Sequence, residues 1–250
     1  MVISTSPGER ATVDHALSTP ARRSSFASPN NSSARMRIIG GAVRGRKLLT
    51  PRSGSLEIRP TSDRAREALF SILAERVSQA AVLDLFAGTG ALGLEAFSRE
   101  AAMVVFVDNN PLAVELIKKN VLHCMAGYRG NCQIRVICHD LQKSLPLKAL
   151  APLGKGTFDL IFADPPYTRE ISPAIVNAIG ESGLLSPTGL LVAEERCNVE
   201  LPKKPAGLRL IDRRIYGEAA FWFYQLNLNQ IEVTEADPKI LPCPPQECRS

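Results

Sequence analysis

The sequence VLDLFAGTGALG, residues 82–93, joins a short apolar run to a glycine-rich turn. Residues 82–86 are apolar apart from Asp84, which is typical of a buried strand. The turn that follows holds three glycines, Gly88, Gly90 and Gly93. Glycine lets a backbone turn sharply and approach a ligand closely. Because residues 92–99 then read as a helix, this stretch predicts a strand, a turn and a helix with a ligand at the turn.

Apolar runs recur along the chain and alternate with helical patterns. Further strands are predicted at residues 103–107, 133–137, 158–163 and 189–194, with a closing strand pair at residues 208–215 and 220–226. Between the first two of these runs, Asn110-Pro111 provides a cap and a first-turn proline for a helix that runs to about His123. Strands that alternate with helices in this way predict an α/β fold.

Two cofactors fit the glycine turn. With Asp108 at the end of the next strand, the turn satisfies the G-x-G-x-x-G dinucleotide fingerprint, in which a carboxylate holds ribose hydroxyls. A pyrophosphate, however, prefers a helix N-terminus without nearby carboxylates. S-adenosylmethionine has no phosphate and carries an ammonium group that Asp84 would attract, so Asp84 favours the methyl donor. A turn that serves only the fold is the structural alternative. The residues predicted to bind S-adenosylmethionine are Asp84, Phe86, Gly88, Gly90, Asp108, Asn109, Asp140 and Asp164.

A stiff polar loop, Asp164-Pro165-Pro166-Tyr167, follows the apolar run at residues 158–163. Proline has no N–H and a fixed φ, so the loop holds its acceptors in place. If the Asp164 carboxylate and the Pro165 carbonyl each accept one hydrogen of a nucleobase amine, the nitrogen can pyramidalise and aim its lone pair at a methyl group. Tyr167 can then stack on the base. These four residues are the predicted catalytic loop; a proline-rich turn with a capping Asp is the structural alternative.

The formal net charge of +5 is unevenly placed along the 250 residues. Residues 1–80 hold 13 Lys and Arg against 6 Asp and Glu, whereas residues 81–250 hold 17 against 19. The basic excess therefore suggests one module that contacts a polyanion beside a near-neutral catalytic body. A solvated charged face is the alternative. The residues predicted to contact RNA are Arg37, Arg44, Arg46, Lys47, Arg59, Arg64 and Arg66.

Residues 36–48 predict a basic hairpin of two short strands around Gly40-Gly41. An amphipathic helix follows, with caps at residues 61–63 and apolar residues at i, i+3, i+4 spacing up to Val77. The predicted organisation is a disordered extension at 1–35, the RNA-contacting hairpin and helix at 36–80, the catalytic domain at 81–226 and a disordered tail at 227–250. For the first segment, a transit peptide or a misassigned start are alternatives.

Other features limit the class of protein. No apolar run approaches the ~20 residues that span a membrane. The six cysteines and three histidines show no zinc spacing, so no metal site is expected. With no secretory signal, the reducing cytoplasm is the expected location.

The chain resembles the bacterial small-subunit ribosomal RNA guanine-N2 methyltransferases of the RsmD type. The matching motifs are RIIGG at 37–41, RGRKL at 44–48, RPT at 59–61, DR at 63–64, RE at 66–67, LF at 69–70, DLFAGTGALGLEA at 84–96 and DPPY at 164–167. The resemblance implies a class I S-adenosylmethionine-dependent methyltransferase, with a Rossmann-like seven-stranded sheet that includes one antiparallel strand and a small N-terminal extension. It also implies methyl transfer to the N2 amine of one guanine in 16S-type ribosomal RNA.

The expected reaction is direct methyl transfer by a monomer, without a covalent enzyme intermediate or a metal, on 16S rRNA or a small-subunit assembly intermediate. A DNA or RNA adenine-N6 methyltransferase is the alternative enzyme, because the adenine amine would satisfy the same two acceptors. From a different class comes an rRNA-binding assembly factor with a vestigial cofactor pocket. The intact set of Asp84, Asp108 and Asp164 argues against that factor.

Overall fold

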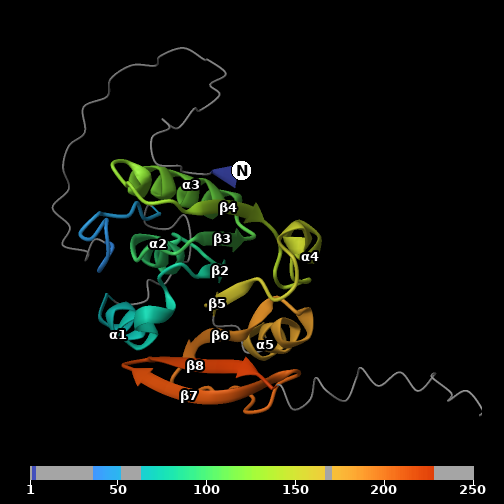
Figure 1. Ribbon diagram of the computed structural model, residues 1–250. Coiled ribbons are helices and arrows are strands. Elements are labelled where there is room, and N and C mark those ends of the chain that lie inside the picture. Colours follow the sequence, from blue (N-terminus) through green and yellow to red (C-terminus); the bar gives the residue numbers. More distant parts are fainter. Residues whose placement is uncertain (1, 4–35, 52–62, 167–170, 228–250) are drawn as a thin grey trace, which may run out of the picture.

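The computed structural model describes residues 2–3, 36–51, 63–166 and 171–227. One eight-stranded sheet runs through it, in the order β1-β4-β3-β2-β5-β6-β8-β7 (Figure 1). The strands are β1 (Val2–Ile3), β2 (Ala81–Leu85), β3 (Met103–Asp108), β4 (Gln133–Cys138), β5 (Phe158–Ala163), β6 (Leu185–Arg196), β7 (Leu208–Tyr216) and β8 (Ala219–Leu226). The helices are α1 (Asp63–Leu73), α2 (Ala91–Ser98), α3 (Pro111–Met125), α4 (Leu147–Leu150) and α5 (Ile171–Ser182), with 3-10 turns at Ala74–Arg76 and Ala151–Leu153.

The strand directions confirm the predicted fold class. Strands β2 to β6 run parallel, β8 is antiparallel to β6, and β7 is antiparallel to β8. From β4 to β7 the sheet therefore has seven strands with one antiparallel member. The chain passes from β2 through β3 to β4 on one side and then returns to β5 on the other. Such a reversal between β2 and β5 is where ligands bind in open α/β sheets, beyond the carboxyl ends of the strands.

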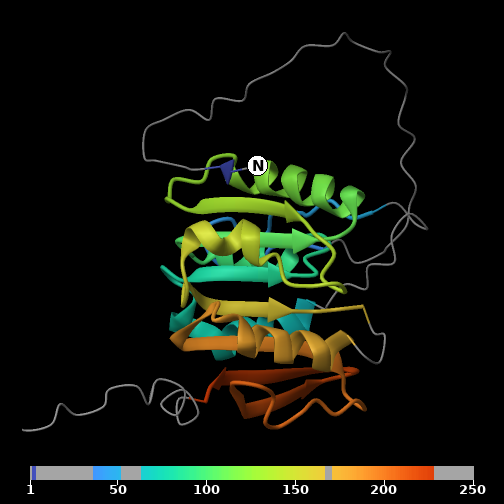
Figure 2. The same cartoon turned by 90° about the vertical axis from the view of Figure 1, so that its right-hand side faces the viewer.

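Helices cover both faces of the sheet because its central strands are apolar on both sides. In β3 every residue after Met103 is buried, as expected for a parallel sheet covered on both faces. Phe106 and Phe162 enter a core shared with α1, α2 and α3. Val105 and Ile161 enter a second core with α4 and α5. In Figure 2, α4 and α5 lie in front of the strands, so each face has its own helical layer.

Residues 36–48 form the predicted hairpin, but with a shorter ladder than two strands would give. The arms meet at one antiparallel bridge between Arg37 and Lys47. Backbone hydrogen bonds extend it on either side: Ile38 N–H donates to Arg46 O at 2.9 Å and Leu48 N–H donates to Met36 O at 2.9 Å. The hairpin and α1 share one apolar core with α2 and α3, so this N-terminal part packs on the body through apolar side chains.

The first residues differ from the predicted disorder. Val2 pairs with Arg135 and Ile3 with Ile134, so β1 adds a short antiparallel strand beside β4. The unpaired backbone groups of an edge strand such as β4 provide a ready template for this pairing. The rest of the predicted extension, most of the predicted tail and the predicted caps at 61 and 62 lie outside the described residues.

Candidate active site

The glycine turn and the predicted catalytic loop lie side by side. Leu85, the last residue of β2, pairs with Ala163, the last residue of β5. One residue further on, the Asp164 N–H donates to Leu85 O at 3.5 Å. Asp108, the predicted ribose ligand at the end of β3, also lies beside the glycine turn, since the Gly88 N–H donates to Asp108 Oδ2 at 2.8 Å. The sheet thus brings the predicted cofactor and catalytic residues to one edge, at the point where the strand order reverses.

The turn after β2 is sharp because three of its residues have positive φ. Phe86 has φ +59°, Gly88 has φ +56° and Gly90 has φ +78°. This conformation is easy for glycine but costs a residue such as Phe on the order of 1–3 kcal/mol. Residues held in this backbone conformation cluster at ligand sites, where contacts with the surrounding structure maintain the strain. Phe86 is half-buried against the α4 and α5 core, which holds the turn in place.

Gly93 has a packing role. A Cβ built on it would lie 2.3 Å from the ring of Phe106 in β3. Any larger residue would therefore push α2 away from the sheet. The third glycine of the motif allows close helix–strand packing, while the first two shape the turn.

Asp84 is buried beneath the first turn of α2. Only 2% of its surface is exposed, and its Oδ2 accepts the Gly93 N–H at 2.8 Å. Burial raises the pKa of Asp84 to about 7; the Gly93 N–H opposes the rise, and the nearby Asp108 charge adds to it. A nearby ammonium group would favour the charged form of Asp84. Because the side chain is almost fully buried, Asp84 would attract such a group by its charge and not by an extensive direct contact. Its bond to the Gly93 N–H also fixes the first turn of α2.

Asp108 organises the backbone around the turn. Its Oδ2 accepts the Gly88 N–H and its Oδ1 accepts the Asn110 N–H at 2.9 Å. Asn110 in turn caps α3 by accepting the Leu112 N–H at 2.9 Å, as the sequence predicts. Each carboxylate oxygen has a second lone pair, so these bonds leave acceptor capacity for ribose hydroxyls.

Asn109 and Asp140 lie together at the next strand ends. The Asn109 side chain is hydrogen-bonded to Asp140, whose Oδ1 also accepts the Gln142 N–H at 3.1 Å. Lys143 lies 3.3 Å from the other carboxylate oxygen. Desolvation opposes the charge of Asp140, but these partners outweigh it and hold its pKa below the usual range. Asp140 is thus an ionised acceptor that could take a hydrogen bond from an adenine amino group.

The residues of the loop after β5 differ in their exposure to solvent. Asp164 is half-buried, Pro165 is buried and Pro166 is exposed. Because Pro165 is buried and its ring fixes its φ, it restricts the backbone of the preceding residue, Asp164. Tyr167 lies outside the described residues, so its stacking role stays a prediction.

Two of the cations predicted to contact RNA have structural roles. Arg66 is fully buried: its Nη2 donates to Arg37 O at 3.0 Å and to Asp63 Oδ1 at 2.6 Å. The prediction that Arg66 contacts RNA is wrong in this conformation, because its guanidinium anchors α1 to the hairpin. Arg46 Nη1 donates to His123 O and to Ala126 O, and so caps the C-terminus of α3.

The remaining predicted cations have open surroundings. Arg44, Lys47 and Arg64 are exposed, and Arg37 is exposed with an ion pair to Asp63 at 3.6 Å. Arg59 lies outside the described residues. These exposed side chains are available for phosphate contacts.

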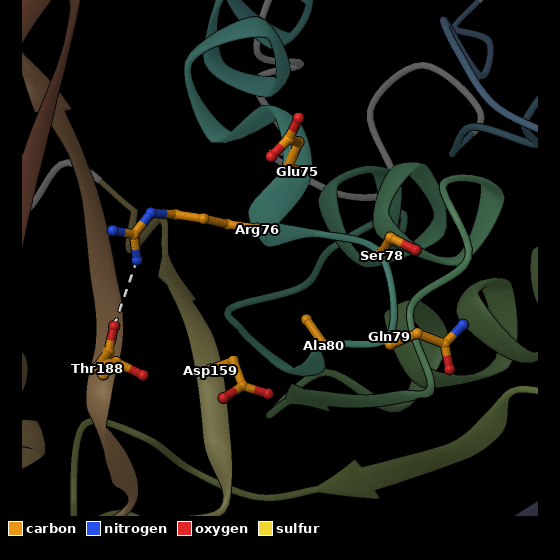
Figure 3. Close-up of a pocket in the computed structure, with 7 residues that line it drawn as sticks. All are labelled: Glu75, Arg76, Ser78, Gln79, Ala80, Asp159 and Thr188. Carbon is orange, nitrogen blue, oxygen red and sulfur yellow. Dashed lines mark hydrogen bonds between the residues drawn. The ribbon is translucent and has the colours of Figure 1, made fainter.

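A hollow lies at the other end of the strands, at their amino ends (Figure 3). Its lining comes from the amino ends of the strands and from the segment before β2: Glu75, Arg76, Ser78, Gln79, Ala80, Asp159 and Thr188. Asp159 Oδ2 accepts the Ala81 N–H at 3.0 Å, and Arg76 donates to Thr188 O at 3.3 Å. These bonds fix the amino ends of the strands, whereas the candidate active site lies at their carboxyl ends, so this hollow is separate from it.

Sequence reasoning missed four buried polar residues in the turn and on the two helices beside it. They are Thr89, Glu95, Ser98 and Asn120, all at most 3% exposed. A polar residue on an apolar helix face is the signal that would have found the last three, because such groups need hydrogen-bond partners.

The strand order, the single antiparallel strand, the glycine turn after β2 and the carboxylate at the end of β3 together define a class I S-adenosylmethionine-dependent methyltransferase fold. The family model described as "Conserved hypothetical protein 95" matches residues 36–225. The chain belongs to this family, the RsmD family.

Relatives agree over most of the chain. The "Ribosomal RNA small subunit methyltransferase D" of Escherichia coli K12 is 36% identical over 198 residues, covering 79% of this chain and 93% of the relative. The protein of the same name from Haemophilus influenzae is 34% identical, covering 78% and 96%. The solved structure of the Escherichia coli protein yhhF has 35% identity and a TM-score of 0.62, covering 77% of this chain and 98% of that one. No helix in the described part of the chain is long and apolar enough to cross a membrane.

Proposed function

We propose that the protein transfers a methyl group to the exocyclic N2 amine of one guanine in small-subunit ribosomal RNA. The observation that carries the proposal is the position of Asp164, one residue beyond β5 and against Leu85 at the start of the glycine turn. This position would hold the amine acceptor beside the cofactor turn. The relatives named as small-subunit rRNA methyltransferases support the choice of RNA.

The residues at this edge fit S-adenosylmethionine. When bound, this cofactor supplies a methyl group activated by a sulfonium. The sharp turn at Gly88 and Gly90 allows close approach of a ligand, Asp108 would accept ribose hydroxyls, and Asp140 would accept an adenine amino hydrogen. The two buried carboxyls Asp84 and Asp108 favour a positively charged ligand over a pyrophosphate.

The roles of the chain's residues in the reaction follow from position and charge. The Asp164 carboxylate and the Pro165 carbonyl would accept the two amine hydrogens and orient the nitrogen lone pair. The rate acceleration would come from holding the reactants in line and from fixed acceptors around the amine, with no covalent enzyme intermediate and no metal. The base would leave its stack and lie against Tyr167.

The partner proposed is 16S-type rRNA, free or in a small-subunit assembly intermediate, acted on by a monomer in the cytoplasm. The exposed cations Arg44, Lys47 and Arg64 would contact its phosphates. The cysteines among the described residues, Cys124, Cys132, Cys138 and Cys197, form no disulfide with one another, which suits a reducing compartment.

The experiment is single-turnover methyl transfer to small-subunit rRNA and to small-subunit particles, followed by nucleoside mass spectrometry. N2-methylguanine is the expected product. N6-methyladenine would replace the guanine assignment with the adenine enzyme. RNA binding without any cofactor binding in calorimetry would favour the assembly factor instead.

A further inference from the structure

The hairpin segment, residues 36–51, contains the hairpin and the residues that follow it, and a side chain of α3, Asn120, links this segment to the cofactor turn. Asn120 is fully buried. Its Oδ1 accepts the Leu49 N–H at 2.7 Å, and its Nδ2 donates to Leu49 O at 3.0 Å. The same Nδ2 donates to Thr89 O at 2.9 Å. One amide therefore ties the hairpin segment to the residue between Gly88 and Gly90.

Thr89 is held from a second direction. Its hydroxyl donates to the Met36 sulfur at 3.2 Å, and Met36 is the first described residue of the hairpin segment. Thr89 is 3% exposed, so water cannot readily replace either partner. On the other side of the turn, the Gly88 N–H bonds to Asp108. The turn thus bonds directly to the hairpin segment through Met36, indirectly to it through Asn120 of α3, and to the end of β3 through Asp108.

The hairpin segment is also fixed along α2, which begins at the turn. Glu95 is fully buried and accepts the Ile39 N–H at 2.7 Å and the Gly40 N–H at 2.8 Å. Ser98 donates to Gly40 O at 2.5 Å and accepts the Val43 N–H at 3.1 Å. Figure 1 shows this segment beside α2 and α3. A shift of the hairpin segment would therefore be transmitted to α2 and to the turn.

We propose that Asn120 is a positioning residue that couples the RNA-contacting hairpin to the cofactor turn. RNA that engages the hairpin segment would favour the arrangement in which Leu49, Asn120 and Thr89 are bonded. That arrangement holds the turn ready for S-adenosylmethionine. The coupling is reciprocal, because an effect of RNA on cofactor affinity requires an equal effect of cofactor on RNA affinity. The inference rests on the proposed function, since it assumes that the hairpin segment contacts RNA.

The test measures the dissociation constant of S-adenosylhomocysteine by calorimetry, with and without saturating small-subunit rRNA, on the full chain. The parent protein is expected to bind it about fivefold or more tightly with RNA, the lower end of typical coupling. Asn120→Ala removes all three bonds and is expected to bring this ratio to within about twofold of one. Val121→Ala is the matched control: the residue is buried on the same helix and apolar, so it lowers stability but should keep the parental ratio.

A second variant covers the case in which Asn120→Ala does not fold. Met36→Leu keeps the apolar volume and every bond of Asn120, but removes the acceptor for the Thr89 hydroxyl. Its ratio is expected to lie between those of the parent and Asn120→Ala. Hydrogen exchange of the Gly88 to Gly90 amides should rise in both variants and stay parental in Val121→Ala.

The outcomes separate the coupling from the function. A parent protein that methylates the RNA but shows a ratio of one would overturn the coupling alone. Parental ratios in Asn120→Ala, or in Met36→Leu if only that variant folds, would do the same. A parent protein that neither binds nor methylates the RNA would overturn the proposed function, and the coupling with it.

Discussion

Asp84 and Asp108 lie on neighbouring strands but have different surroundings. Asp108 accepts backbone N–H groups on both oxygens, from Gly88 and Asn110. Asp84 has one such bond, from Gly93, and is almost fully buried. Asp108 therefore has acceptor capacity for the ribose hydroxyls predicted for it, whereas Asp84 holds α2 and would act on the predicted ammonium group by its charge.

The raised pKa of Asp84, about 7 because of its burial, predicts a pH-dependent stability. The unfolded chain releases this proton near pH 4. Between about pH 4 and pH 7 the folded state therefore holds one more proton than the unfolded state, and stability falls by ~1.4 kcal/mol per pH unit before levelling off. Asp84→Asn removes this slope. In chemical denaturation, the stability of the variant relative to the parent should rise by roughly 2–3 kcal/mol from pH 5 to pH 8. A constant difference across this range would contradict the buried, titrating carboxyl.

Asp164 is predicted to act on the chemical step. Asp164→Ala removes the charged acceptor of the loop, so the single-turnover rate should fall roughly 100- to 1,000-fold, as for other preorganised groups at a reacting centre. Asp164→Asn nearly preserves the shape and one acceptor oxygen, and an intermediate rate is expected. Chemical denaturation of the same preparations serves as the control for folding, and rates at saturating cofactor separate the chemical step from any change in cofactor affinity. A parental rate in Asp164→Ala would contradict the proposed mechanism.

At the scale of elements, apolar runs predicted the strands well, because strands buried on both faces of a parallel sheet consist mostly of apolar residues. The strand predicted at 133–137 is observed at Gln133–Cys138, and the strand predicted at 82–86 at Ala81–Leu85. The strand predicted at 189–194 begins earlier, at Leu185, because its pairing with β5 continues past an irregularity near Phe158. Helix α4 has only four residues and leaves no periodic pattern to detect.

The roles of the cations were less predictable than the strands. A count of basic residues does not distinguish Arg46 and Arg66 from Arg44, because most of the atoms that bind the first two are distant in sequence. The partners of Arg46 lie 77 and 80 residues away, and Arg66 binds a carbonyl 29 residues away. Burial of such side chains depends on tertiary packing, which the local pattern does not contain.

The cap of α3 gives the prediction for this scale. Arg46→Met keeps an apolar stem but removes the guanidinium that bonds His123 O and Ala126 O. Favourable charge at a helix C-terminus and the hydrogen bonds that the guanidinium makes predict a decrease of about 1–2 kcal/mol in the free energy of unfolding. Arg44→Met, at an exposed position, should change it by less than about 0.5 kcal/mol. Equal effects of the two changes in chemical denaturation would argue against the cap.

At the scale of the molecule, the hairpin spans the length of α2. Met36 contacts Thr89 at the cofactor turn, whereas the Ala42 N–H donates to Ser98 O at the last residue of α2. At ~1.5 Å per residue, this helix places the tip of the hairpin roughly 12 Å from the turn. Arg44, next to the tip, would therefore contact phosphates away from the target nucleotide. In the proposed function the basic surface would therefore orient a large RNA, while the strand ends with Asp164 would act on one base.

The salt dependence of RNA binding tests this surface. Arg44→Ala combined with Lys47→Ala removes two exposed cations of the hairpin and leaves the Arg46 cap and buried Arg66 intact. For each phosphate that the protein no longer neutralises, the slope of log affinity against log salt should fall by about 0.7–0.9, so the fall for the double variant should reach up to about 1.4–1.8. Cofactor affinity without RNA should stay parental, because neither side chain bonds to the turn.

The matched control removes two exposed cations from another part of the molecule. Lys148 lies on α4, on the opposite face of the sheet from the hairpin, and Lys155 follows it in a loop. Lys148→Ala combined with Lys155→Ala changes the net charge by the same amount, so any general effect of charge on RNA binding appears equally in both double variants. A larger decrease of the salt slope in the hairpin variant locates the phosphate contacts there. Equal slopes in both variants and the parent would make the hairpin cations a solvated face, and the RNA would then have to bind through other residues.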